Sequence, residues 1–100
     1  MEKLYEYLGI LVLFHSNEHD PIHVHGRYQD RESKAEIIVL DGKAIEIRIV
    51  FTKSKPLKGP QLKDFETLVK YYADDIIQSW IDYFVFHKQV TSKRITTRIK

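Results

Sequence analysis

The amino-acid sequence predicts an α+β fold: an antiparallel sheet of four to five strands, one long C-terminal helix packed on one face, and a short terminal strand. Three observations predict it. Apolar and polar residues alternate in short segments of the first half of the chain, as in half-buried strands. In the second half, apolar residues recur at steps of three and four, as on one face of a helix. The length of 100 residues is that of a single domain, which we assign to residues 1–100.

Two strands are predicted before residue 30. Residues 4–15 are rich in β-branched, aromatic and aliphatic side chains and stop at the polar cluster 16–18, so we expect one strand here, apolar on both faces near its end. Residues 23–29 alternate with the period of a strand. The polar run 30–34 that follows predicts a turn.

The next two segments predict a hairpin. Residues 35–40 and 44–53 flank Asp41-Gly42, a dipeptide that tolerates the positive φ values of a tight turn. The second of these segments has the clearest alternation in the chain. Its apolar residues share one face, which we expect to meet the core: Ile45, Ile47, Ile49 and Phe51.

A helix is predicted after a loop that contains Pro60, since proline suits the first turn of a helix. A helix of about 24 residues would be about 36 Å long, which exceeds the expected width of the domain. We therefore expect a bend or break near Ala73. The stripe that faces the sheet consists of Leu62, Phe65, Val69, Tyr72, Ile76, Trp80 and Phe84.

The end of the chain is basic, although the whole chain has 16 basic and 14 acidic residues and a formal net charge of +2. Residues 94–99 alternate and predict an edge strand. Basic side chains here, together with Arg27, are candidates for binding phosphate or an acidic partner. A solvated terminal strand with ordinary surface charges is the alternative. The candidate residues in the basic end are Lys93, Arg94 and Arg98.

Composition excludes several classes of protein. The chain has no cysteine, so it has no disulfide framework, no thiolate nucleophile and no cysteine-built zinc site. Its longest apolar run, Leu8 to Phe14, is too short to cross a bilayer. The acidic Glu2 and Glu6 do not fit a secretory signal. We therefore expect a soluble, cytoplasmic protein without a membrane partner.

Three histidines that are close in the sequence are the candidate metal-binding or catalytic residues. Two positions along a strand place His23 and His25 on one face, with Cα atoms about 6.6 Å apart. Their imidazoles can converge on one divalent transition metal, and His19 supplies a third ligand if Pro21 turns the loop back. This hypothesis predicts a metal site made of His19, His23 and His25.

The same residues suggest two other hypotheses. Because histidine titrates near neutral pH, His23 and His25 are a candidate catalytic pair, base and acid, for cleaving RNA through its 2′-hydroxyl. Arg27 on the same strand face would then hold the phosphate. Alternatively, the histidines are structural and satisfy loop carbonyls. The residues leave open whether the protein is an enzyme.

The histidine segment resembles the signature of a small bacterial family, domain of unknown function 4160. The matching residues are Asn17, Glu18, His19, Pro21, His23, His25 and Tyr28. The resemblance extends over a hairpin and over a helix with Asp74, Asp75 and Trp80. Two positions differ: Ile22 replaces a second signature proline, and Tyr72 stands where family members often have a histidine.

The resemblance implies that the protein binds a partner molecule, and it implies no particular catalytic activity. Members of the family are often encoded beside another small protein, an arrangement similar to that of toxin–antitoxin pairs. It implies a toxin–antitoxin-like or nucleic-acid-binding module, with RNA or a cognate small protein as partner. The alternatives from the residues are the metal-binding domain and a non-catalytic homodimer formed through the edge strand or the aromatic end of the helix, where Tyr83 and Phe86 lie.

Overall fold

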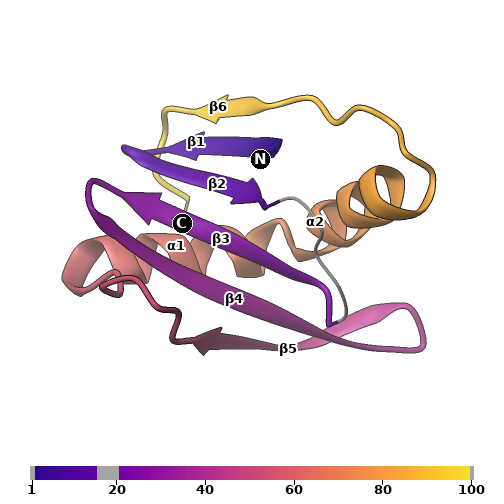
Figure 1. Cartoon of the computed structure of the whole chain (residues 1–100), viewed down its shortest axis with the longest axis horizontal. Helices are drawn as coiled ribbons and strands as arrows, with labels where there is room; N and C mark the ends of the chain where they lie inside the picture. Colours follow the sequence, from indigo (N-terminus) through magenta and orange to yellow (C-terminus); the bar gives the residue numbers. More distant parts are fainter. Residues whose placement is uncertain (1, 16–20, 100) are drawn as a thin grey trace.

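The computed structural model describes residues 2–15 and 21–99. In these residues six strands form one sheet, and the helical segments lie on one face of it (Figure 1). The sheet has the strand order β5-β4-β3-β2-β1-β6, and all neighbours are antiparallel except β6, which runs parallel to β1. The strands are β1 (Glu2–Tyr7), β2 (Ile10–Phe14), β3 (His23–Tyr28), β4 (Arg31–Leu40), β5 (Lys43–Val50) and β6 (Lys93–Ile95).

The α+β class is confirmed, but the sheet is mixed and has more strands than the predicted four to five. Residues 4–15 do not form one strand, because the chain reverses at Leu8 and Gly9. Both have positive φ values, 50° and 84°, as in the two-residue turns that join antiparallel strands. Tyr7 pairs with Ile10 across this turn, so the segment predicted as one strand forms two strands, β1 and β2.

The second hairpin also turns in two residues. β3 pairs with β4 from Tyr28 opposite Arg31 onward, so only Gln29 and Asp30 form the turn. Gln29 takes the positive φ, 55°. Most of the predicted polar turn 30–34 is therefore strand. The third turn, at Asp41 and Gly42, is the one that the sequence predicts.

The predicted single long helix is not continuous, and it is broken close to Ala73, where its length predicts a bend or break. Two shorter helices, α1 (Gly59–Tyr71) and α2 (Ala73–Trp80), are followed by a π-helical turn, η1 (Ile81–Val85). The break lies at Tyr72, whose φ of −104° and ψ of 20° are not helical and whose ring stacks on Tyr5. A straight helix of about 36 Å would reach beyond a molecule whose longest dimension is 34 Å. The break keeps the apolar residues of α2 in the core.

The core fills the space between the helices and one face of the sheet. Phe65 of α1 lies against Gly26 of β3 so closely that a Cβ atom on Gly26 would be 2.5 Å from the ring. The predicted apolar face of β5 only partly joins this core. Ile47 and Ile49 are half-buried against it, whereas Ile45 is 59% exposed. Phe51, just beyond β5, is 83% exposed.

None of the helices in the described part of the chain combines the length and the apolar character that a membrane span requires.

Candidate functional site

Strand β3 carries different residues on its two faces. Val24 and Gly26 point to the helices, so His23, His25 and Arg27 point to the helix-free face. Both histidines are nevertheless buried, with exposed fractions of 6% and 7%. Their rings are 5.3 Å apart, centroid to centroid. The alternation along β3 thus brings the two rings together on one face, as the sequence predicts.

Glu32 of β4 connects this face of β3 to the end of β2. Its Oε2 atom is 3.0 Å from Nε2 of His15 and 3.3 Å from Nδ1 of His25. Its Oε1 atom accepts a hydrogen bond from Nε of Arg27 at 3.2 Å and contacts Nη2 at 3.1 Å. One carboxylate oxygen therefore faces two imidazoles, and the other is held by the fork of a guanidinium group.

The environment of Glu32 favours its charged form. Burial raises the pKa of the Glu32 carboxyl, but the hydrogen bonds from His15 and Arg27 and the electrostatic effect of His15 and His25 outweigh it, so the pKa is lowered overall. The ring of His15 also lies edge-on against that of His25, with 4.1 Å between their centroids. The carboxylate is thus available as an anionic ligand at neutral pH.

The three groups have the chemistry and spacing of a metal site. Ligand atoms of His15, His25 and Glu32 all lie within 4.8 Å of one another. Ligands about 2.0–2.2 Å from one ion are about 2.8–3.6 Å apart at octahedral or tetrahedral angles. The two separations from Glu32 fall in this range. Two imidazole nitrogens and a carboxylate oxygen suit zinc and similar divalent ions.

This cluster shares one residue with the predicted metal set. His25 belongs to both, whereas His19 lies outside the described residues. His23 has its Nδ1 atom 2.7 Å from the carbonyl oxygen of Pro21, which accepts a hydrogen bond from it. That nitrogen cannot ligate a metal while the bond is made. Only its Nε2 atom could then ligate, and His23 is not among the residues whose ligand atoms converge. We therefore treat His23 as a neighbour of the cluster, with its ring against that of His25.

Sequence reasoning missed Glu32 because it assigned that residue to a turn. A two-residue turn after Tyr28 places Arg27 opposite Glu32. Gln29-Asp30 lacks the glycine that marks such a turn. The start of β4 could therefore have been recognised only from the alternation of residues after this turn. His15 was missed as a ligand because its place beside His25 depends on the pairing of β2 with β3, which brings Leu13 opposite His25.

The predicted phosphate-binding residues are distributed over several ion pairs. Arg27 is bonded to Glu32, Arg94 to Glu6 at 2.9 Å, and Arg98 to Asp64 at 2.6 Å. Lys93 lies exposed in β6. Two strands, β1 and β2, separate β6 from β3, so the structure does not bring the basic end to the histidines.

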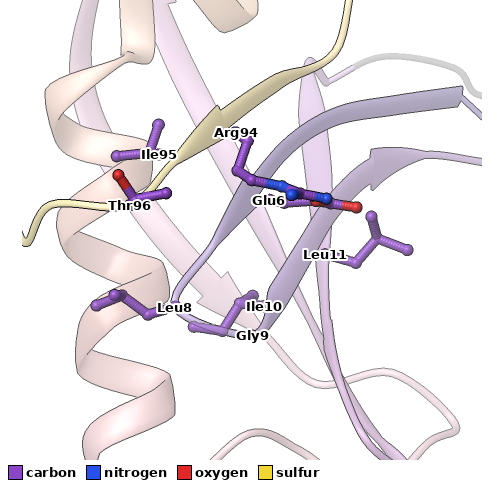
Figure 2. A pocket seen from close by; sticks show the side chains of 8 residues that line it. All are labelled: Glu6, Leu8, Gly9, Ile10, Leu11, Arg94, Ile95 and Thr96. Atoms are coloured by element: carbon purple, nitrogen blue, oxygen red, sulfur yellow. The ribbon is translucent and has the colours of Figure 1, made fainter.

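A hollow of about 520 Å³ lies beside the turn between β1 and β2. Figure 2 shows the Glu6–Arg94 pair on one side of it and Leu8 and Ile95 on the other. Most of the surface that lines it is apolar, and its charged residues, Glu6 and Arg94, are bonded to each other. Its lining offers a place for an apolar group, not for a metal ion.

Comparison with known proteins identifies the family. No curated protein and no solved structure matches the chain. The family model described as domain of unknown function (DUF4160) matches residues 9–81, which include β2 to α2 and all three residues of the His15–His25–Glu32 cluster. The chain therefore belongs to the DUF4160 family.

Proposed function

We propose that this protein is a metal-binding module that holds one divalent transition metal ion on the helix-free face of its sheet, with His15, His25 and Glu32 as ligands. The observation that carries the proposal is the convergence of their ligand atoms within 4.8 Å. The three residues come from β3, β4 and the end of β2, which are neighbours in the sheet. The hydrogen-bonded register therefore fixes their spacing.

The surroundings support metal binding in two ways. The Arg27 guanidinium holds the Glu32 oxygen that faces away from the histidines, which is the kind of contact that orients a ligating carboxylate. Burial of His25 restricts the movement of its ring. Three protein ligands also leave a further coordination position for water or a substrate, an arrangement that metal sites with catalytic roles share.

The test is calorimetric titration of the untagged protein with Zn²⁺, Mn²⁺ and Ni²⁺. We expect one ion to bind per chain for at least one of these metals. His15→Ala and Glu32→Gln should each weaken that binding by roughly tenfold or more, since each removes or neutralises a ligand. His87→Ala is the matched control, because His87 is an exposed histidine two residues beyond η1. Binding that is absent, or equally tight in His15→Ala and wild type, contradicts the proposal.

An RNA-directed module, catalytic through His23 and His25 and belonging to a toxin–antitoxin-like pair, has less support. The adjacency of the two rings favours it. The ion pairs of Arg27, Arg94 and Arg98 weigh against it, because each guanidinium already contacts a carboxylate. Induced expression tests this alternative: growth arrest that His23→Ala abolishes supports it, and normal growth with intact bulk RNA argues against it.

A further inference from the structure

The two outer strands of the sheet differ in length and chemistry. β6 has three residues, of which Lys93 and Arg94 are charged. β5 has eight residues and pairs only with β4 in the described part of the chain. A short outer strand offers few backbone groups for pairing with another chain, whereas a long one offers many. β5 also carries Lys43, Glu46 and Arg48, so only a strand with complementary charges suits it. β5 is therefore the edge at which another strand can add.

Apolar groups are exposed along this edge. Ile45 is 59% exposed and has no partner in β4, because the pairing shifts there from Ile38 opposite Glu46 to Val39 opposite Ala44. Phe51 is 83% exposed. Beside the edge is a hollow of about 570 Å³ between β5 and the helices. Its lining combines Ala44, Ile45, Ile47, Tyr71 and Ala73 with the charged residues Glu46, Lys70 and Asp74.

The charges of β5 are complementary to those of a second β5. Antiparallel pairing centred on Ile47 places Glu46 opposite Arg48 of the second copy, and Arg48 opposite its Glu46. A shift of two residues places Glu46 opposite Glu46, or Arg48 opposite Arg48, and like charges directly opposite are destabilising. Along an antiparallel strand, only every second residue points its backbone N–H and C=O groups outward. A shift of one residue would therefore prevent these groups of the two copies from forming hydrogen bonds with each other. Charge therefore selects one register.

The same register also suits the apolar residues. Ile45 lies opposite Ile49 of the second copy, and Ile47 lies opposite its own counterpart. Phe51 lies opposite Lys43, next to the Ala44 and Ile45 that line the hollow of the other copy. Glu46 and Arg48 already bond to each other within one copy at 2.7 Å. In the dimer, these two side chains and their two counterparts would form a group of four charges in which each acidic group is next to basic ones.

We propose that the protein forms a homodimer in which β5 pairs antiparallel with β5 of a second copy about Ile47, with Glu46 opposite Arg48 in both directions. The two sheets then form one continuous sheet. Phe51 of each copy covers the hollow beside β5 of the other. Glu46 and Arg48 pair with Ile38 and Glu36 of β4, on the side of the sheet away from the core residues Ile37 and Ala35.

The test is the molar mass in solution, measured by light scattering and by sedimentation over a range of concentrations. We expect wild type to be a dimer at high concentration. Glu46→Arg and Arg48→Glu should each raise the dimer dissociation constant roughly tenfold or more, because both cross-strand pairs become repulsive. A mixture of the two variants should restore the dimer as a heterodimer, since both positions are then basic in one copy and acidic in the other.

Two controls keep the test specific. Lys93→Glu places a charge change on the opposite edge and should leave the dimer unchanged. Circular dichroism shows whether each variant is folded, and Phe51→Asp, an exposed position, should weaken the dimer without affecting the fold. A wild type that stays monomeric at high concentration overturns the proposal. A dimer whose dissociation constant is unchanged by Glu46→Arg and Phe51→Asp also overturns it. The same holds if the Glu46→Arg and Arg48→Glu variants do not associate when they are mixed.

Discussion

The two faces of β3 carry opposite chemistry along the same six residues. On one face Gly26 lets the ring of Phe65 approach the strand, and the surroundings are mostly apolar. On the other face His25 and Arg27 both contact the carboxylate of Glu32. The apolar face holds the strand in place by close packing. The polar face can therefore carry charged groups whose partners come from the neighbouring strands. The close packing of the strand and its candidate chemistry thus lie on different sides of the strand.

The largest effect is expected on the apolar face. Phe65→Ala removes a fully buried ring and should lower the free energy of unfolding by about 3–5 kcal/mol. Urea denaturation measures it. A loss below about 1 kcal/mol would mean that the contact between α1 and β3 does not hold the strand.

Gly26→Ala should lower the free energy of unfolding by about 1–3 kcal/mol, because the added methyl group overpacks the same contact. Urea denaturation again gives the value. The comparison of the two faces predicts that metal still binds to the folded fraction of this variant. If metal binding is lost while the protein remains folded, the two faces are not independent.

The polar face should contribute stability that depends on pH. The pKa of the Glu32 carboxyl is lower in the folded protein than its ordinary value, so the unfolded state binds the proton more readily. The contribution of Glu32 is complete above the unfolded pKa, about 4.3, and is lost as pH falls through the lower folded pKa. Urea denaturation from pH 7 to pH 3 should therefore show a smaller acid-induced loss for Glu32→Gln than for wild type. Equal losses in the two proteins would show that Glu32 does not contribute.

The smallest effect is expected for an ion pair away from both faces of β3. Arg98 is bonded to Asp64, but its side chain is 63% exposed, and exposed pairs contribute only about 0–1 kcal/mol. Arg98→Ala should therefore leave the thermal unfolding midpoint nearly unchanged. A loss as large as that of Gly26→Ala would mean that the C-terminal segment is part of the cooperative core.

Local patterns predict some parts of this molecule and not others. The α+β class, the turn at Asp41-Gly42 and the apolar stripe of the helices follow from alternation, turn chemistry and helical period. The turns at Leu8 and Gln29 are different, because leucine and glutamine are not the residues that usually begin such turns, unlike Asp41, although all three adopt positive φ. The break at Tyr72 interrupts a continuous apolar period, so the pattern does not indicate it. The expected break near Ala73 follows instead from comparing the helix length with the width of the domain.

Local patterns likewise predict one part of the candidate site and not the rest. Alternation along β3 predicts that His23 and His25 share a face. Their contact with His15 and Glu32 depends on the registers of β2 with β3 and of β3 with β4, which the two unpredicted turns determine. The ligand set is therefore non-local. His15 and Glu32 are 17 residues apart in the chain, and no fixed spacing of the kind found in short metal-binding motifs connects them.

The most direct test of the metal site is an anomalous difference map from crystals of the wild-type protein grown with Zn²⁺. We predict a single strong peak on the helix-free face, about 2.0–2.2 Å from Nε2 of His15, Nδ1 of His25 and Oε2 of Glu32. No peak at these three atoms, with Glu32 still in contact with both histidines, would contradict the account.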